Sequence, residues 1–461
     1  MTKLFPVSAV IFLFPILLWA APADPVRILF DPATRRPVRY SALQNDTRRV
    51  MIPVWYRVKP GEMRGVWIAT VSNLDFPKSV TPAQFQRTYT DLMFKLKRAG
   101  FNAVFFQIRP SCDAFYNSAI HPTSRFLCGR EGYGFPKFDL LGFMIGEAHR
   151  HGLQFHAWLN PYRVAGFTNL PKWQYLKTLS SRNFARMNPD TVLAVPVRGG
   201  LTLLLDPGRP EVRSHLLATV REIIQKYTPD SIHFDDYFYP YDYSGNADVP
   251  TYRKYNRDPR ISIENWRRQN VSQMVWEVSA LIRENNRRLK KNIRFGISPF
   301  GIWRNRASSA FGSPTLGNEA YSSNYSDARL WIKNNWIDYV VPQLYWKFSH
   351  PKAPYAGLAD WWADTVAGTR VKLYIGHGVH LAFMASDPAE LKNQLLFNSR
   401  RPRISGSVFY SGSRIFNPDT PTRRRAVEAV VRDCWHGVLP AAAPPRPATP
   451  PRQSVIQKVG K

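Results

Sequence analysis

The feature that most constrains the fold of this chain is a regular alternation, starting at Met63, of short apolar runs with amphipathic segments of helical period. Alternating strands and helices favour a parallel sheet covered by helices. The eight apolar runs occupy residues 63–70, 101–109, 153–160, 231–238, 293–299, 337–346, 372–379 and 404–410. Eight such units are typical of an α/β chain that closes into a (β/α)8 TIM barrel, here expected over residues 63–437.

A doubly wound open sheet is the competing architecture. Such sheets usually have fewer units and carry a glycine-rich phosphate-binding turn after the first strand. The corresponding turn here is Thr70-Val71-Ser72-Asn73, which contains no glycine. The first helix has a clear start at Thr81-Pro82, a capping side chain followed by proline in the first turn. We therefore predict the closed barrel.

Three segments lie outside this pattern. Residues 24–62 are polar and contain proline, with a weak strand signal at Val54-Trp55-Tyr56, and we interpret them as an N-terminal segment lying against the barrel. Residues 161–206 form a long insertion after the third strand. Residues 438–461 are rich in Ala, Pro and basic side chains, so they are expected to be a disordered tail that packs no core.

Residues 1–23 have the layout of a secretory signal peptide. Lys3 precedes an apolar run over residues 4–19, and small alanines follow at positions 20, 21 and 23. Pro6, Pro15 and the shortness of the run favour cleavage over a permanent span, and no cysteine is present there for lipid attachment. We expect an exported protein of the periplasm or cell envelope, with no stable membrane anchor after cleavage. An uncleaved anchor is the alternative.

The charge balance indicates an anionic partner. There are 63 basic and 33 acidic side chains, which gives a net charge of +30. Nucleic acid is one candidate, but the basic residues are scattered and no zinc-finger, basic-zipper or RNA-recognition signature accompanies them. Together with the export signal, this favours an anionic envelope polymer, and no nucleic acid is expected. The sequence does not indicate an oligomeric state.

The three cysteines leave two alternatives open. Cys112 and Cys128 fall in one predicted loop, where a disulfide would stabilise the fold by about 3 kcal/mol in the chain-entropy treatment. Three unpaired thiols are the other alternative. The cysteine spacing is unlike a zinc site, and His156 and His377 have no paired ligands at helical spacing. We therefore predict no metal and no cofactor.

Polar side chains gather at the carboxyl ends of the predicted strands, where TIM barrels place their active sites. Period-two alternation puts these side chains on the inward faces, while the intervening Leu159, Phe234 and Leu344 face the helices. The inward residues are Gln107, Arg109, His156, Trp158, Asn160, His233, Asp235, Gln343 and Tyr345. So many polar groups at one end are costly unless they line a solvent-filled site.

The strongest single feature is the pair Asp235-Asp236 at the end of the fourth strand. Hydrolysis of a glycosidic bond normally uses two carboxyl groups, one as acid and one as nucleophile or base. Neighbouring carboxylates repel, which raises one pKa and favours a protonated acid near neutral pH. The alternative is that one aspartate caps a loop or pairs with an arginine. Flanked by Tyr237 and Tyr239 at this position of a barrel, the pair predicts a glycoside hydrolase.

With the strands assigned, the sequence resembles the glycosyl-hydrolase-like 10 family over the barrel. The matching runs are MRGVWIATVS at 63–72, HAWLNPYRV at 156–164, LDPG at 205–208, FDDYFY at 234–239, GISP at 296–299, WRNR at 303–306, PQLYW at 342–346, WWAD at 361–364 and LYIG at 373–376. The resemblance implies cleavage of a β-linked N-acetylhexosamine polymer, specifically peptidoglycan strands lacking stem peptides. A lipoprotein member of the family has a lipidation cysteine that this chain lacks, so membrane anchoring does not carry over.

The implied substrate suggests roles for three residues. An acetamido group on the reacting sugar can itself be the nucleophile. Our hypothesis is that Asp236 is the general acid/base, that Asp235 orients the acetamide, and that Tyr345 hydrogen-bonds the acetamide oxygen. A rival hypothesis makes one of the pair a direct nucleophile. Its distant partner would then be Glu319, Asp206 or Glu131.

Further polar and aromatic residues are candidate substrate contacts. The guanidinium groups of Arg109, Arg163 and Arg304 suit the lactyl carboxylate of muramic acid, with structural ion pairs as the alternative. Stacking platforms are expected at Trp158, Tyr237 and Trp346, although Trp158 also suits the barrel core. Asn160 and Gln343 complete the predicted set, and His233 is interpreted as a hydrogen-bonded orienter. A non-catalytic envelope glycan-binding protein is the alternative function.

Overall fold

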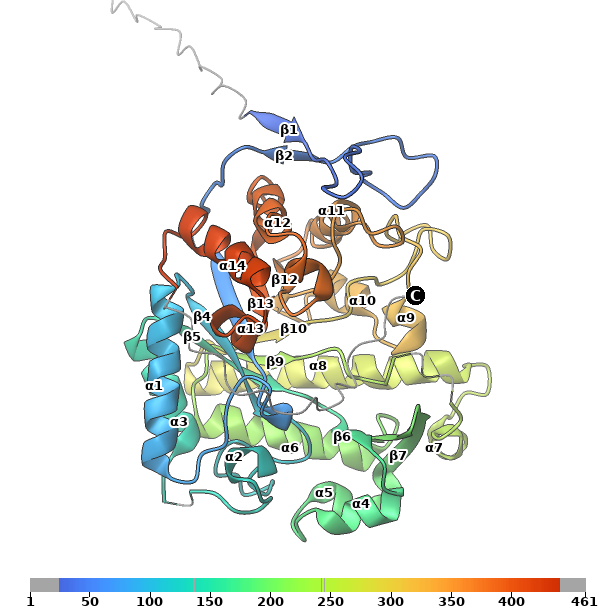
Figure 1. Ribbon diagram of the computed structural model, residues 1–461. Helices are drawn as coiled ribbons and strands as arrows, with labels where there is room; N and C mark the ends of the chain where they lie inside the picture. The colour runs from blue at the N-terminus through green and yellow to red at the C-terminus, as the bar shows by residue number, and fades with distance from the viewer. Residues whose placement is uncertain (1–24, 136, 242, 244, 440–461) are drawn as a thin grey trace, which may run out of the picture.

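The computed structural model describes residues 25–135, 137–241, 243 and 245–439 (Figure 1). The predicted signal peptide and residues 440–461 of the predicted tail lie outside these residues. Within them, no helix is long and apolar enough to cross a membrane. The same residues contain no group of three or more His, Cys, Asp or Glu side chains placed to hold a metal ion.

Eight parallel strands close into a barrel, as predicted. Their order around the barrel is β10-β11-β12-β13-β3-β4-β5-β9. The strands are β3 (Met63–Ile68), β4 (Ala103–Arg109), β5 (Gln154–Leu159), β9 (Ser231–Phe234), β10 (Arg294–Ile297), β11 (Tyr339–Val340), β12 (Lys372–Gly378) and β13 (Ile404–Tyr410). Each lies within one of the eight predicted runs, so the predicted TIM barrel is confirmed.

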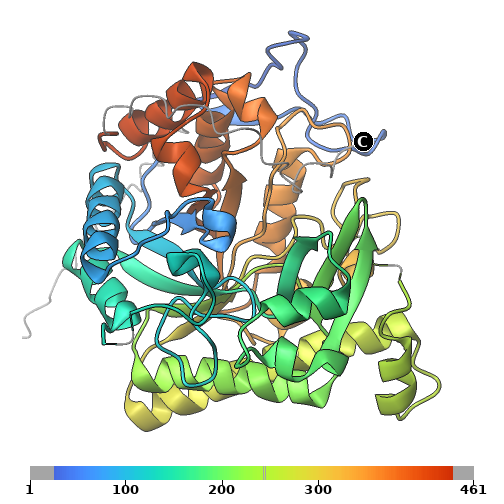
Figure 2. The same cartoon turned by 60° about the horizontal axis from the view of Figure 1, so that its bottom comes forward.

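The predicted helices cover the outside of the barrel (Figures 1 and 2). They are α1 (Pro82–Arg98), α3 (Leu140–Arg150), α6 (Pro210–Lys226), α8 (Ile263–Leu289), α10 (Ala328–Lys333), α11 (Tyr355–Thr365), α12 (Glu390–Ser399) and α14 (Pro421–Asp433). Helix α1 begins as expected, because the Thr81 hydroxyl accepts a hydrogen bond from the Gln84 N–H at 3.2 Å and Pro82 occupies the first turn. Its buried face carries Phe85, Tyr89 and Met93 toward the strands.

Shorter elements occupy the loops. They are η1 (Val71–Asn73), α2 (Arg125–Cys128), η2 (Pro189–Thr191), α7 (Val249–Tyr255), α9 (Ala320–Ser323), η3 (Ala382–Ala385) and α13 (Gly412–Phe416). The sequence did not predict them individually. A single turn of helix forms where a local cap is available and carries little periodic signal.

The insertion after β5 folds into a small antiparallel sheet that the sequence analysis did not predict. It consists of β6 (Arg163–Thr168), β7 (Val192–Val197) and β8 (Gly200–Leu205), in the order β6-β8-β7. Helices α4 (Lys172–Thr178) and α5 (Phe184–Met187) lie between β6 and β7. Figure 2 shows this sheet, in green, at one side of the molecule.

The N-terminal segment forms a two-stranded antiparallel sheet, β1 (Val26–Ile28) with β2 (Met51–Pro53). Strand β2 packs against α12, and Arg27 Nη2 donates a hydrogen bond to Asn393 Oδ1 of that helix at 3.2 Å. The weak strand signal at 54–56 falls just after β2, in a bend.

Side chains inside the barrel form a core that is partly polar. Met63, Trp67 and Phe105 represent the apolar part. The Tyr339 hydroxyl is the centre of the polar part, with Ser231 Oγ at 2.7 Å, His156 Nδ1 at 2.9 Å and His233 Nδ1 at 3.2 Å. Burial lowers the pKa of His233 to about 3, so the ring is neutral and acts through hydrogen bonds.

All three cysteines are free thiols. The sequence left open a disulfide between Cys112 and Cys128 or three unpaired thiols, and the structure has the unpaired thiols. Cys112 is buried, and its Sγ lies 3.7 Å from the Arg163 carbonyl oxygen. Cys128 Sγ lies 2.8 Å from the Tyr133 carbonyl oxygen. The two sulfur atoms contact different parts of the backbone, so Cys112 and Cys128 form no disulfide although they are close in sequence.

Packing at the barrel interior gives a first prediction. A Cβ added at Gly296 of β10 would lie 2.0 Å from Tyr339 Cζ, against a ring held by three hydrogen bonds. Gly296→Ala is expected to lower the free energy of unfolding by ~1–3 kcal/mol, because the ring cannot move without breaking these contacts. The measurement is a chemical denaturation curve.

Gly146 is the matched control, because a Cβ there meets nothing within 4 Å on the exposed side of α3. Gly146→Ala is expected to stabilise the protein by about 0.5–1 kcal/mol, since alanine loses less backbone entropy in a helix. Equal changes in the free energy of unfolding for Gly296→Ala and Gly146→Ala would contradict the close packing of Gly296 against Tyr339.

Candidate active site

The site is built where β5 and β9 end side by side. Their parallel register pairs Trp158 with His233 and Leu159 with Phe234, so Asn160 and Asp235 follow at the same edge. Asp235 is buried and accepts hydrogen bonds from Trp158 Nε1 at 3.1 Å and Asn160 Nδ2 at 2.9 Å. The inward faces predicted for Trp158, Asn160 and Asp235 are therefore observed in one hydrogen-bonded group.

Two opposing effects act on the Asp235 carboxyl. Burial raises its pKa above the ordinary value, while the Arg163 guanidinium charge and the Trp158 and Asn160 donors favour the ionised form. The Arg163 guanidinium also lies 4.7 Å from the centre of the Tyr237 ring. Because both neighbouring side chains donate hydrogen bonds, the Asp235 oxygens are held as acceptors, in the geometry of a carboxylate.

Asp236 differs from its neighbour in its electrostatic surroundings. Burial first, and then the charge of Asp235, raises its pKa to about 8, while a hydrogen bond from Gln343 opposes the shift. The Tyr241 hydroxyl also donates to Asp236 Oδ2. Asn324 Nδ2 fixes the backbone by donating to the Asp236 carbonyl oxygen at 3.0 Å. A carboxyl with this pKa is protonated at neutral pH and can act as a general acid.

Aromatic rings line the region around the pair. Tyr237 and Tyr241 are in edge contact, with ring centres 5.6 Å apart, and Tyr241 contacts Phe300 at 5.5 Å. Phe300 in turn meets the predicted stacking residue Trp346 at 5.3 Å. These four rings form a series of edge-on and tilted contacts that begins beside Asp236.

The structure brings Tyr345 and Gln343 to the same place. The Tyr345 ring lies 6.2 Å from that of Tyr410, and burial first, then the neighbouring acidic groups of Tyr410, Asp236 and Tyr237, raise the pKa of Tyr345 well above its ordinary value. Gln343 Nε2 donates to the Ser298 carbonyl oxygen at 2.9 Å, besides its contact with Asp236. The segment that follows β11 therefore brings two of the predicted site residues to the carboxyl pair.

Trp158 has a dual position. Its indole N–H donates to Asp235, yet the side chain is only 6% exposed and belongs to the cluster inside the barrel. The packing of Trp158 is therefore that of a barrel-core residue, which was the alternative given for it. Its hydrogen bond to Asp235 also makes it a support for the site.

Arg109 lies beneath the site instead of facing a ligand. It has no exposed surface, and its Nη1 donates to the carbonyl oxygens of Asn160 and, at 3.1 Å, Pro161. The register of β4 against β5 shifts between Gln107 and Arg109, which directs the guanidinium to the end of β5. The predicted contact of Arg109 with a substrate carboxylate is corrected. Its guanidinium donates to backbone carbonyl oxygens, where the alternative had expected an ion pair, and so fixes the backbone that carries Asn160.

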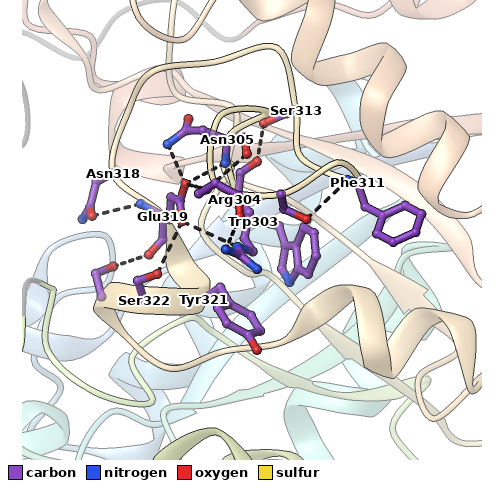
Figure 3. Close-up of polar contacts among 12 residues, drawn as sticks. Trp303, Arg304, Asn305, Phe311, Ser313, Asn318, Glu319, Tyr321 and Ser322 are labelled. Carbon is purple, nitrogen blue, oxygen red and sulfur yellow. Dashed lines mark hydrogen bonds and ion pairs between the residues drawn. The ribbon is translucent and has the colours of Figure 1, made fainter. Parts of the chain in front are cut away.

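Arg304 belongs to a loop with its own network, drawn in Figure 3. Its Nε lies 3.8 Å from Glu319 Oε2, and its guanidinium lies 4.9 Å from the centre of the Tyr321 ring. Glu319 Oε1 also accepts hydrogen bonds from Asn305 N and Nδ2, each at 2.8 Å. These contacts place Arg304 with Glu319 and not with the carboxyl pair.

The other two carboxylates of the rival hypothesis are likewise engaged elsewhere. Asp206 accepts from Thr251 Oγ1 at 2.5 Å and from Gly208 N at 2.9 Å, and burial raises its pKa to about 6. Glu131 accepts from Ser180 N at 2.7 Å and Asn183 Nδ2 at 2.6 Å. Each of the three carboxylates holds its own loop together.

Sequence reasoning missed Tyr241 in the site and a buried carboxyl group, Asp75, at another position on the rim of the barrel. Tyr241 lies five residues after Asp236, and its only signal was the run of tyrosines there. Asp75 is buried between the ends of β3 and β13, where it accepts from Ala69 N at 2.8 Å and Ser411 Oγ at 2.6 Å. No motif marks Asp75, because its partners come from opposite ends of the chain.

A TIM barrel with two buried carboxyl groups at the end of one strand, with the pKa of Asp236 raised to about 8 and with aromatic rings beside the pair, has the arrangement of a glycoside hydrolase. The comparisons with known proteins agree. The family model described as Glycosyl hydrolase-like 10 matches residues 62–388, and the chain belongs to this family.

Two proteins that are similar to this chain in sequence are named glycosyl hydrolases. The chain is 39% identical over 361 residues to Glycosyl hydrolase YngK of Bacillus subtilis (strain 168), covering 76% of this chain and 68% of YngK. It is 37% identical over 382 residues to Glycosyl hydrolase DigH of Escherichia coli (strain K12), covering 78% of this chain and 84% of DigH. The protein is therefore a glycoside hydrolase.

Among solved structures, the glycoside hydrolase domain of PgaB (BpsB) from Bordetella bronchiseptica superposes with a TM-score of 0.50 at 14% identity. The match covers 81% of this chain and 98% of that domain. At this identity the likeness shows the fold alone.

The environment of Asp236 predicts a pH-dependent stability. Its pKa is raised from 3.8 to about 8, so between these values the folded protein holds a proton that the unfolded chain has released. The free energy of unfolding therefore falls as the pH rises through this window. Asp236→Asn keeps the shape and removes the titration, so we expect it to melt above the wild type at pH ~8, with the difference shrinking toward pH ~4.

Differential scanning calorimetry at the two pH values measures this effect. Asp190→Asn, at an exposed carboxyl, is the control and should melt like the wild type at both. A wild type that melts above Asp236→Asn at the higher pH would show that the Asp236 carboxylate is well solvated or paired when ionised.

Proposed function

We propose that this chain is an exported glycoside hydrolase of the periplasm or cell envelope that cleaves β-linked N-acetylhexosamine glycan, namely peptidoglycan strands lacking stem peptides. The observation that carries the catalytic part is the division within the pair: Asp235 is held by two donors as an acceptor, and Asp236 has a pKa near 8. The resemblance of the sequence motifs supports the substrate.

Charge supports the same substrate. A muramic acid residue without its stem peptide has a free lactyl carboxylate, so a peptide-free strand is a polyanion. The net charge of +30 would attract such a strand, and Arg163 places a guanidinium beside Asp235 for a carboxylate in the site. Arg163 is the one predicted arginine that the structure brings to the carboxyl pair.

The proposed reaction uses the acetamido group of the substrate as nucleophile. The acetamide oxygen attacks the anomeric carbon while Asp236 donates its proton to the departing glycosidic oxygen. Asp235 accepts a hydrogen bond from the acetamide N–H and stabilises the positive charge that develops on the ring so formed. Tyr345 donates its hydroxyl proton to a hydrogen bond with the acetamide oxygen and positions it for attack.

The second half returns the enzyme to its starting state. Asp236, now a carboxylate, removes a proton from water, and the water oxygen attacks the anomeric carbon and reopens the ring. The raised pKa of Asp236 suits both halves, because a group that titrates near neutral pH can give a proton and take one back.

This proposal predicts the behaviour of the two asparagine variants. On peptide-free glycan strands, Asp236→Asn and Asp235→Asn are each expected to lower kcat by ~10²–10⁴-fold, because the first removes the acid/base and the second removes the charge that guides the acetamide. The readout is new chain ends, identified by mass spectrometry of the products. Wild-type kcat should fall above pH ~8 as Asp236 loses its proton.

Controls separate chemistry from folding and from binding. Asp190→Asn should hydrolyse the strands like the wild type. Strands that retain their stem peptides should be poor substrates, and uncharged N-acetylglucosamine oligomers test the need for the lactyl carboxylate. Binding of the strands without cleavage by the wild type would replace the proposal with a glycan-binding function, and undiminished activity of both asparagine variants would refute the catalytic roles.

A further inference from the structure

One face of the β1–β2 sheet is apolar and open to solvent. Val26, Ile28 and Phe30 are 54%, 41% and 52% exposed, and Met51 on the neighbouring strand is 42% exposed. We call these four residues the hairpin face. Large apolar side chains at such exposure, side by side on one sheet, typically mark a contact surface.

The register explains why these side chains share one face. Residues opposite each other in an antiparallel pair point the same way, and Ile28 is paired with Met51. Arg27 and Ile52 form the adjacent pair and point to the other side, where Ile52 is fully buried and Arg27 contacts α12. One face of the β1–β2 sheet therefore packs against the barrel domain, and the opposite face, the hairpin face, is exposed to solvent.

Further exposed apolar side chains follow β2 in the sequence. Val54, Trp55 and Val58 are 44%, 49% and 56% exposed. Tryptophan has an apolar body with a polar N–H and is favoured where a protein enters the interface of a bilayer.

Arginines flank the hairpin face. Arg39 and Arg49 are paired across an isolated antiparallel bridge, and Arg49 lies two residues before Met51 and so on the same side of the strand. Arg35, Arg36 and Arg57 are exposed in the same segment. Residues 25–62 contain eight basic and three acidic side chains.

We propose that the hairpin face and its flanking arginines bind the surface of an anionic lipid bilayer. Apolar side chains would enter the boundary of the acyl chains while the arginines contact lipid phosphates, which is how reversible interfacial binding arises. Figure 1 shows β1 and β2 at the periphery of the molecule beside α12, where a flat surface can approach them. Such docking would place the hydrolase at a membrane surface without a lipid or transmembrane anchor.

The charge distribution favours lipid over a second copy of the chain. Self-association through the hairpin face would bring two arginine-rich segments together in molecules that each have a net charge of +30. A hydrated glycan strand could neutralise the arginines but offers no apolar layer for Ile28, Phe30 and Met51.

The test is co-sedimentation with vesicles. The protein used in the test lacks residues 1–23, because the apolar run over residues 4–19 would itself bind lipid. Binding is expected to vesicles of equal parts phosphatidylcholine and phosphatidylglycerol, and to be much weaker with phosphatidylcholine alone. It should weaken in ~1 M salt, where the screening length is ~3 Å.

Two pairs of matched variants locate the binding. Ile28→Glu with Phe30→Glu is expected to reduce partitioning roughly tenfold or more, because charge is placed in the apolar layer. Val80→Glu with Trp173→Glu, which changes apolar side chains elsewhere that are even more exposed than Ile28 and Phe30, should bind like the wild type. Arg39→Ala with Arg49→Ala should reduce binding to the anionic vesicles only, whereas Arg198→Ala with Arg288→Ala, at exposed arginines elsewhere, should have a smaller effect.

Melting curves confirm that each variant is folded, and none of these residues belongs to the carboxyl site, so glycan hydrolysis should be unchanged. Equal vesicle binding by the hairpin-face variant and its control would overturn the proposal. So would the absence of binding to anionic vesicles, and so would a dimer seen by light scattering that Ile28→Glu with Phe30→Glu dissociates while vesicle binding is absent.

Discussion

The site depends on one interaction, the pairing of β5 with β9. That register sets Asn160 beside Asp235 and aligns the Trp158 indole with the same carboxylate, so the hydrogen bonds that fix Asp235 follow from backbone pairing. A slip of one residue would turn these side chains to the helix-facing side, because alternate residues of a strand point to opposite faces. Arg109 secures the arrangement from below by holding the carbonyl oxygens at the end of β5.

The pairing of β5 with β9 also gives the two aspartate side chains, Asp235 and Asp236, different electrostatic surroundings. Asp235 is surrounded by donors and by the Arg163 charge, which favour its ionised form. Asp236 is buried beside that negative charge, which raises its pKa to about 8. Burial raises the pKa of both carboxyl groups, and the different partners of the two side chains set how each pKa is shifted further.

The sequence predicted correctly those features that depend on the period of apolar residues along a strand or helix, or on residues adjacent in the chain. It located all eight barrel strands, and it placed Trp158, Asn160, Asp235, Gln343 and Tyr345 at one end of the barrel. It failed for long flexible side chains: Arg109 turned inward to backbone carbonyls and Arg304 joined Glu319, since a guanidinium can reach partners in several directions. It also missed the small sheet β6-β8-β7, in which β6 pairs with β8 across an intervening segment that contains α4, α5 and β7.

The sequence by itself determined the barrel and the location of the carboxyl pair, because strand and helix periods are local properties and the ends of parallel strands must meet. Only the tertiary structure showed that the pKa of Asp236 is raised to about 8, that Tyr241 donates a hydrogen bond to this carboxyl, and that Cys112 and Cys128 stay apart. The physical reason is that pKa, hydrogen-bond partner and sulfur distance depend on neighbours brought from distant parts of the chain, and no local pattern records them.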